Sequence, residues 1–279
     1  MDADSLPHPS PQGMTIYHWR HGLLLLAPTL VLERTTTPLC ATLRLACNKP
    51  YTIDVAGEEM ETWASLVAPR VERRKVIAID SHVALFYFPI EWPEYQGLQQ
   101  KIAGRDWINF EASQFSEVID VLRPAFSQLL TSDTVIGVAR QAVEVISGAT
   151  IPAPQRVDDR IEALRQRLDE TPLNEVNVET LSREIGLSAA RTRTLFKQQI
   201  GTTIQHYARW AAIWKAIKGW STDRTLTEVA IDAGFYDLAH ADHTFIEMFG
   251  IAPSLVVDQR FVTIVPCETD HPTGQRLSG

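Results

Sequence analysis

The sequence predicts an α+β protein of two domains: an N-terminal β-barrel with flanking helices, and a C-terminal all-α domain with two helix-turn-helix motifs. Three observations predict this architecture. Residues 17–92 alternate short apolar runs with turns, as β-strands do. A helical period begins after Pro93, and one helix–turn–helix pattern occurs twice between Asn177 and Gln259. The 279 residues suffice for two domains with separate cores.

The N-terminal strand pattern is typical of a small sandwich or barrel. Turn residues separate the candidate strands at a regular spacing, and these strands are residues 42–46, 51–55, 63–67, 76–79 and 83–88. Residues 23–32 are apolar, but they are too few to span a bilayer and contain Pro28, so we interpret them as a buried strand pair. Apolar positions at helical spacing then predict two helices, near residues 115–122 and 135–146.

The two copies of the repeated pattern share their glycines and phenylalanines. The matched pairs are Gly186 with Gly234, Phe196 with Phe245, and Gly201 with Gly250. In each copy a glycine ends a short helix, and a second helix follows after a tight turn. Ser188 and Asp237 are suited to cap the second helices, and Thr225 with Glu228 forms a capping box in the second copy. Residues 204–219 predict a spacer helix of about 24 Å, directed toward successive major grooves about 34 Å apart.

The charge is distributed unevenly along the chain. A net charge of −8 would by itself argue against a nucleic-acid partner, but it is an average over segments of opposite charge. Residues 176–218 hold seven Lys and Arg against two Asp and Glu, whereas residues 219–260 hold two against seven, and residues 1–155 hold 12 against 17. One basic module therefore lies between acidic ones, and it contains the first copy of the repeat.

Residues from about 160 to 260 resemble the DNA-binding domain of the AraC/XylS family of bacterial transcription regulators. The resemblance is carried by Ile185-Gly-Leu-Ser188, Leu195-Phe196-Lys197, Ala233-Gly-Phe235 and, most specifically, Phe249-Gly-Ile-Ala-Pro253-Ser254. It implies a cytoplasmic transcription regulator that binds double-stranded promoter DNA and contacts RNA polymerase, and not an enzyme. The N-terminal half looks like the cupin-type sensor half of such regulators in general pattern.

This resemblance divides the chain into segments. They are a disordered tail (1–13), a cupin-like sensor and dimerisation domain (14–150), a linker (151–156), an AraC-type DNA-binding domain (157–262) with motifs at about 178–201 and 226–250, and a C-terminal tail (263–279). A charged helix with an apolar stripe from Val157 to Leu168 either caps the DNA-binding domain or pairs with a copy of itself.

In such domains the outward face of the second helix of each motif enters the major groove. In the first copy that face offers Ala190, Arg191, Arg193, Thr194 and Lys197. Arginine pairs bidentately with guanine, so Arg193 is the first candidate for a base contact. Arg191 and Lys197 are candidates for phosphate contacts.

The second copy departs from the family pattern. The resemblance leads us to expect serine or threonine followed by arginine, but the chain has Asp242-His243. An aspartate facing the groove would meet phosphates of like charge, which leaves weaker contacts from Ala239, His240 and His243. With phosphate contacts from the first copy alone, the log–log salt slope is about −3 per subunit. Because that is weak binding, we expect a homodimer, formed through the N-terminal half or through the Val157–Leu168 helix.

The N-terminal domain shows no catalytic constellation. Trp63, Tyr87 and Phe88 are candidates to line a pocket for an unknown small-molecule effector. The candidate strands offer only the isolated His82 toward the histidine cluster of a metal-binding cupin, so no metal or cofactor is expected. The three cysteines have no CxxC spacing, which favours a reducing compartment, and no membrane segment is expected. Two alternatives remain: a degenerate family member that acts through protein contacts, and a cupin-type enzyme.

Overall fold

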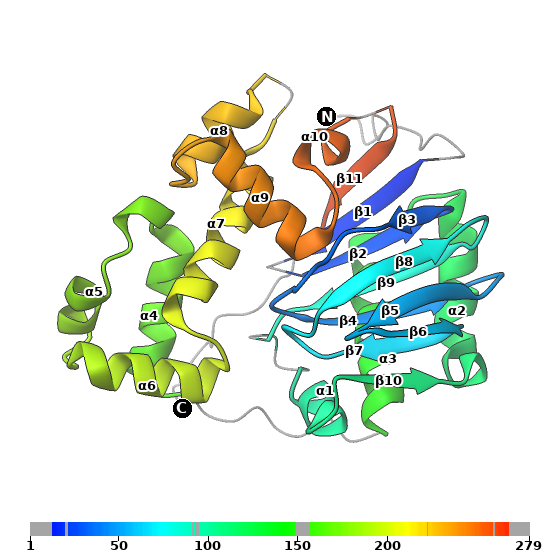
Figure 1. Ribbon diagram of the computed structural model, residues 1–279, viewed down its shortest axis with the longest axis horizontal. Helices are drawn as coiled ribbons and strands as arrows, with labels where there is room; N and C mark the ends of the chain where they lie inside the picture. Colours follow the sequence, from blue (N-terminus) through cyan, green and yellow to red (C-terminus); the bar gives the residue numbers. More distant parts are fainter. Residues whose placement is uncertain are drawn as a thin grey trace, which may run out of the picture.

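The computed structural model describes residues 13–19, 22–90, 92, 95–148, 157–221, 223–258 and 260–267. The expected linker, 151–156, and nearly all of the expected N-terminal tail lie outside these residues. Figure 1 shows a β-sheet half beside a helical half, so the predicted α+β class is confirmed.

Two β-sheets form the N-terminal half. One has the order β10-β7-β4-β9-β2-β1-β11, and the other has the order β3-β8-β5-β6. The strands of the first sheet are β1 (Met14–Trp19), β2 (Gly22–Ala27), β4 (Ala41–Ala46), β7 (Ala64–Val67), β9 (Val83–Phe88), β10 (Trp107–Phe110) and β11 (Val262–Pro266). Those of the second are β3 (Leu30–Leu32), β5 (Tyr51–Val55), β6 (Glu58–Thr62) and β8 (Arg73–Ala78).

The seven-stranded sheet is buried on both faces. Because successive side chains of a strand point to opposite faces, Leu85 and Tyr87 of β9 face the second sheet, whereas Phe86 and Phe88 face a layer of helices. That layer, which lies behind the sheet in Figure 1, consists of α1 (Tyr95–Ile102), α2 (Ser116–Leu122), α3 (Ser132–Ser147) and the short 3₁₀ turns η1 (Ala112–Phe115) and η2 (Arg123–Phe126). Burial on both faces explains why β2, β4 and β9 are buried at every position.

The C-terminal half contains both predicted motifs. Its helices are α4 (Asp159–Glu170), η3 (Leu173–Glu175), α5 (Val178–Glu184), α6 (Ala189–Ile200), α7 (Ile204–Gly219), α8 (Leu226–Asp232), α9 (Leu238–Phe249) and α10 (Pro253–Val256). The predicted caps are confirmed. The side chain of Ser188 accepts from the backbone N–H of Arg191, that of Asp237 accepts from His240, and Thr225 with Glu228 forms the capping box.

The first motif has a core of its own. The apolar residues of α4, α5, α6 and α7 pack together, and Ile161, Leu164 and Leu168 of α4 are buried among them. The apolar stripe of the Val157–Leu168 helix therefore packs on the helices of the first motif. The expectation that it dimerises the protein is wrong, because this face is already covered within the chain.

The second motif shares its core with the N-terminal domain. Trp210 and Trp214 of α7 and Phe245 and Phe249 of α9 belong to the same buried cluster as Tyr87 of β9. The sequence did not indicate that the N-terminal domain covers these helix faces.

The expected tail over residues 263–279 is corrected in its first part. β11 (Val262–Pro266) pairs in parallel with β1, with Met14 opposite Val262 and His18 opposite Pro266. It satisfies the backbone groups along an otherwise unpaired strand edge. Its side chains also alternate between the two cores, Val262 on one side and Val265 on the other. The second motif is thus tied to the N-terminal sheet on both sides of α10.

The two turn glycines differ in their surroundings. Gly186 and Gly234 have φ angles of +69° and +89°, but an added methyl group meets open space at Gly186 and the backbone of Leu173 at Gly234. We expect Gly186→Ala to lower the free energy of unfolding by about 1 kcal/mol. Gly234→Ala should cost on the order of 3 kcal/mol or more, because backbone must move. Urea unfolding followed by circular dichroism measures both, and equal losses would contradict the tight packing of the second turn.

Candidate DNA-binding face and inter-domain pocket

The outer face of α6 carries all five residues predicted for the first motif. Leu195 and Phe196 anchor the helix in the core, and the opposite face is exposed. That face consists of Ala190, Arg191, Arg193, Thr194 and Lys197. The structure therefore places three cations and a hydroxyl group on one solvent-facing helix surface, which is suited to contact phosphates and base edges.

Arg193 has an acidic partner that the sequence did not predict. Its Nη2 donates to Oε1 of Glu179 on α5 at 2.7 Å, and both side chains are about half exposed. This hydrogen bond lowers the pKa of the Glu179 carboxyl. An exposed pair of this kind is worth little in stability. Its effect is to hold the guanidinium on the side of α5, next to the exposed face of α6.

The three residues predicted for the second motif also lie together. Ala239, His240 and His243 are exposed on α9. The imidazole of His240 stands edge-on to Phe235, with ring centroids 5.2 Å apart. The two histidines offer hydrogen-bond donors, but the described part of α9 has no lysine or arginine to pair with a phosphate.

Asp242 does not face the groove as we expected. It lies on the inner side of α9, at the edge of an apolar pocket with Leu238 and Phe245, and its Oδ1 atom is buried without a hydrogen-bond partner in the described chain. Burial raises the pKa of this carboxyl. The expectation that Asp242 faces the groove and repels DNA phosphates is therefore wrong.

Glu247 is likewise engaged within the protein. Its backbone carbonyl accepts from the N–H of Thr37 at 2.9 Å, and its carboxylate lies 3.8 Å from the Nη1 atom of Arg209. Thr37 belongs to the N-terminal domain, in the loop after β3. Glu247 thus joins the second copy both to α7 and to the N-terminal domain.

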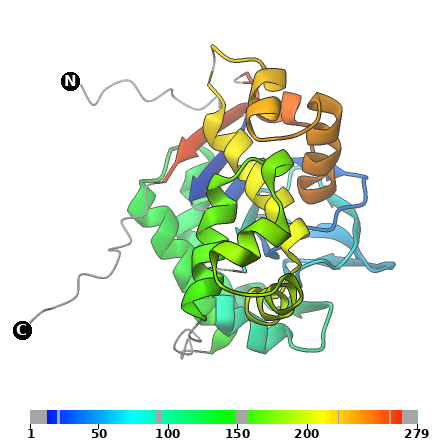
Figure 2. The ribbon, with the colours of Figure 1, turned by 90° about the vertical axis from the view of Figure 1, so that its left-hand side faces the viewer.

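The second helices of the two motifs, α6 and α9, are not parallel. α6 lies across the view in Figure 1 and is seen end-on in Figure 2, whereas α9 is seen along its length in both views. α7 has the predicted bounds and separates the motifs as expected. The docking of α9 on the N-terminal sheets sets its direction independently of α6.

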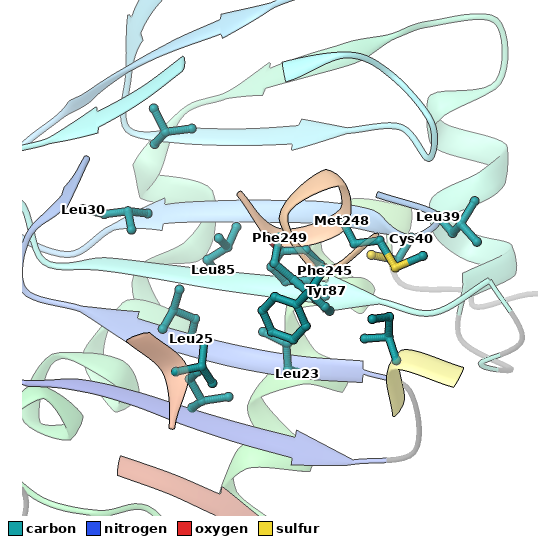
Figure 3. Packing of buried hydrophobic residues seen from close by; sticks show 14 of the residues in the cluster. Leu23, Leu25, Leu30, Leu39, Cys40, Leu85, Tyr87, Phe245, Met248 and Phe249 are labelled. Atoms are coloured by element: carbon teal, nitrogen blue, oxygen red, sulfur yellow. The ribbon is translucent and has the colours of Figure 1, made fainter. Parts of the chain in front are cut away.

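An apolar pocket lies where the two domains meet. It opens to solvent, and the space within it, including solvent at its mouth, is about 570 Å³. The N-terminal domain and β11 contribute Ile16, His18, Leu23, Leu25, Leu30, Leu32, Leu85, Tyr87 and Ile264, and the helical domain contributes Trp214, Ile217, Phe245, Phe249, Ile251 and Val256. Figure 3 shows Phe245, Met248 and Phe249 of α9 over Tyr87, with Leu23, Leu25 and Leu85 beside them.

Only one of the three predicted effector-pocket residues lies in this pocket. Tyr87 is part of its wall, with its ring centroid 5.4 Å from that of Phe249. Phe88 points to the opposite face of the sheet, where it stacks on Phe86 and Trp92, and Trp63 is 42% exposed. The prediction is wrong for Phe88, because strand alternation turns it away from Tyr87, and for Trp63, because it lies at the surface between β6 and β7.

His18 is the one titratable imidazole of the pocket wall. It lies within β1, and its ring centroid is 6.2 Å from that of Trp214. Burial, and next the positive charge of Lys218, lower its pKa. The imidazole is therefore neutral at neutral pH, so the pocket wall carries no charge there.

Sequence reasoning missed the helical wall of this pocket. Trp214, Ile217 and Phe249 belong to it, and their spacing had indicated only buried helix faces.

The described residues hold no group of three His, Cys, Asp or Glu side chains that would bind a metal ion. Within the same residues no helix is long and apolar enough to cross a membrane.

The comparisons with known proteins agree with this architecture. Residues 181–259 match a family model described as a helix-turn-helix domain. The fold is similar to that of ToxT from Vibrio cholerae: an apo variant is 10% identical, with a TM-score of 0.53 over 85% of this chain and 97% of that chain. ToxT with an unsaturated fatty acid bound is 12% identical, with a TM-score of 0.51 over 84% of this chain and 93% of that chain.

At this identity the likeness to ToxT is one of fold. No curated protein matches the sequence significantly. The family match covers the two motifs whose helices, caps and turns are described above. Residues 181–259 therefore form a helix-turn-helix domain, within a two-domain fold similar to that of ToxT.

Proposed function

We propose that this regulator reads specific DNA sequences mainly with the first helix-turn-helix motif. The observation that carries the proposal is the exposed face of α6, where Arg191, Arg193 and Lys197 lie together. Arg193 makes the base contact, and the other two contact phosphates. The second motif adds weaker contacts from His240 and His243.

The two motifs as arranged do not present parallel helices to one straight duplex. α9 is packed against the N-terminal domain, and its direction differs from that of α6. Engagement of both motifs therefore requires α9 to shift or the DNA to bend. We propose that the first motif binds on its own and that the second is engaged only after such a change.

We further propose that a small, largely apolar molecule binds in the inter-domain pocket. Both domains contribute its walls. A ligand there therefore has one affinity when α9 is packed against the N-terminal domain and another when α9 has moved away, so it shifts the populations of these two arrangements. The fatty acid bound by ToxT supports a ligand with an apolar body, as a likeness of fold. Ligand binding would thus change how α9 is presented to DNA.

The remaining parts of the proposal concern assembly. Residues 14–150 are the sensor and dimerisation domain, and residues 157–262 are the DNA-binding domain. We propose a cytoplasmic homodimer that binds promoter DNA and contacts RNA polymerase. We assign dimerisation to the N-terminal half, because α6 and α7 cover the apolar stripe of α4. A dimer roughly doubles the number of phosphate contacts and so raises affinity at cellular salt concentrations.

A salt titration tests the proposal. The full-length protein is titrated against duplex DNA from the region upstream of its own gene and against a scrambled duplex, in gel shifts from low to physiological salt. We expect preference for the upstream duplex and a log–log slope of about −3 per subunit. Absence of a sequence-specific shift even at low salt would refute DNA reading and favour the alternative in which the family member acts through protein contacts.

The ion pair on the first motif yields a second prediction. Glu179→Gln removes the carboxylate that holds Arg193, and it also removes a negative charge beside the phosphates. We expect DNA affinity to rise about two- to fivefold. Glu170→Gln, an exposed change on α4, is the matched control and should have a smaller effect. A loss of affinity in Glu179→Gln would mean that the pair positions Arg193 for its base contact.

A further inference from the structure

Two arginines are buried between the sheets of the N-terminal domain. Arg44 in β4 is 2% exposed, and Arg73 at the start of β8 is 1% exposed. Arg44 lies on the face of β4 that is turned toward the second sheet. Arg73 reaches from the second sheet to the end of β7, where its Nη2 donates to the backbone carbonyls of Val67 and Ala68 at 3.4 and 3.2 Å.

Neither guanidinium has an acidic partner in the described chain. Nη1 of Arg44 donates to the hydroxyl of Thr42 at 3.1 Å, and Nη1 of Arg73 donates to the carbonyl of Val71 at 3.3 Å. The Nε atom of each arginine is buried and has no hydrogen-bond partner among the described residues. Each unused Nε–H is a charged donor of the kind that binds an oxygen of a carboxylate or phosphate.

Two cations in this position are costly. Burial, and next the positive charge of Arg44, lower the pKa of Arg73 to about 9. Arg73 therefore keeps its charge at neutral pH, and burial also lowers the pKa of Arg44. Removing even one ion from water costs several kcal/mol unless an opposite charge compensates for it. Among the described residues, no aspartate or glutamate forms an ion pair with either arginine.

The surroundings are suited to an anion. The hydroxyl of Tyr51 lies 2.8 Å from that of Ser65, and Tyr87 interacts electrostatically with both arginines. Tyr87 is also part of the wall of the inter-domain pocket. The arginine pair therefore adjoins the apolar pocket across one aromatic side chain, whereas the pocket wall itself carries no charge at neutral pH.

We infer that a small organic anion binds between the two sheets, with its carboxylate or phosphate group accepting hydrogen bonds from Arg44 and Arg73. The rest of such a molecule extends past Tyr87 toward the apolar pocket. The inference deepens the proposed function, on which it rests for the role of effector, by assigning that effector a negative charge.

Wild-type protein provides the first test. Octanoate and octanamide have the same apolar body, but only octanoate carries a charge, and inorganic phosphate supplies the other anionic group. We expect octanoate or phosphate to raise the Tm by on the order of 5 °C at about 100-fold above its Kd. Octanamide should bind at least about tenfold more weakly than octanoate in calorimetry, because it lacks the charge that pairs with the arginines.

Variants then locate the site. Arg44→Met and Arg73→Met remove the charges and keep most of the side-chain volume, and we expect each to abolish the anion-dependent rise in Tm. Arg74→Met is the matched control, because Arg74 is the exposed neighbour of Arg73 and pairs with Glu72. It should bind like wild type. If a buried variant does not fold, the comparison of octanoate with octanamide on wild type still decides the proposal.

Native mass spectrometry of the purified protein completes the test. A mass excess that disappears on denaturation, and that Arg44→Met lacks, supports the anion. The inference is overturned if no anion co-purifies and neither octanoate nor phosphate shifts the Tm. Cys40 interacts electrostatically with both arginines. A thiol titration that finds Cys40 as a thiolate in the anion-free protein therefore also overturns the inference, because the thiolate then compensates the arginines. None of these measurements uses DNA, so failure of DNA binding in the gel shift is a separate result.

Discussion

Arg193→Ala is expected to lower the affinity for the specific duplex by about 10- to 100-fold, whereas His243→Ala lowers it about threefold or less. Arg193 lies on an exposed, basic helix face and offers a bidentate donor to guanine. His243 lies on a helix that has no lysine or arginine among its described residues. Fluorescence anisotropy with the upstream and scrambled duplexes, at one low salt concentration, measures both losses.

A matched control accompanies this prediction. Arg123→Ala removes an exposed arginine of the N-terminal domain that pairs with Asp120, and it should leave DNA affinity unchanged. The loss in Arg193→Ala should also be smaller for the scrambled duplex than for the upstream duplex, because a base contact adds specificity. Equal losses for Arg193→Ala and His243→Ala would show that both motifs read DNA alike.

Phe249→Ala is expected to lower the free energy of unfolding by about 3–5 kcal/mol. Its ring lies 5.4 Å from that of Tyr87, 5.9 Å from Trp210 and 4.7 Å from Phe245, measured between centroids. The substitution leaves a cavity in a core that both domains share. Urea unfolding, followed by tryptophan fluorescence and by circular dichroism, measures the loss.

The control for this core is Tyr236→Ala. Tyr236 precedes α9 and is 86% exposed, so its loss should change stability by about 0.5 kcal/mol or less. Because the N-terminal sheets contribute to the cluster around Phe249, we expect both probes to report one shifted transition. Two separate transitions, with only one of them shifted by Phe249→Ala, would show that the domains unfold independently.

Nearly all local features, such as helix caps and turns, were predictable from the sequence. Gly186 and Gly234, with Ser188 and the Thr225–Glu228 capping box, define both motifs, and the structure has each cap and turn where the sequence predicts it. The face of α6 that carries Arg193 follows from the positions of Leu195 and Phe196. These features are predictable because they depend on residues within one or two helical turns of each other.

Contacts between distant segments were not predictable in this way. Asp242 and Phe88 were assigned to the wrong faces, because the sequence does not show which face of an element another domain covers. Arg44 carried an unused signal: it is an arginine between leucines in a strand that is buried at every position. A charge in such a run indicates either an exposed edge or a buried site for an opposite charge.

The sequence by itself determined the two-domain α+β class, the tandem helix-turn-helix motifs and the basic face of the first. The tertiary structure alone decided that β11 joins the N-terminal sheet, that α9 closes an inter-domain pocket and that Arg44 and Arg73 meet between the sheets. The physical reason is the range of the interactions. Helix periods, caps and turns act over a few residues, whereas these contacts join residues as far apart as Met14 and Val262, whose pairing depends on how the whole chain packs.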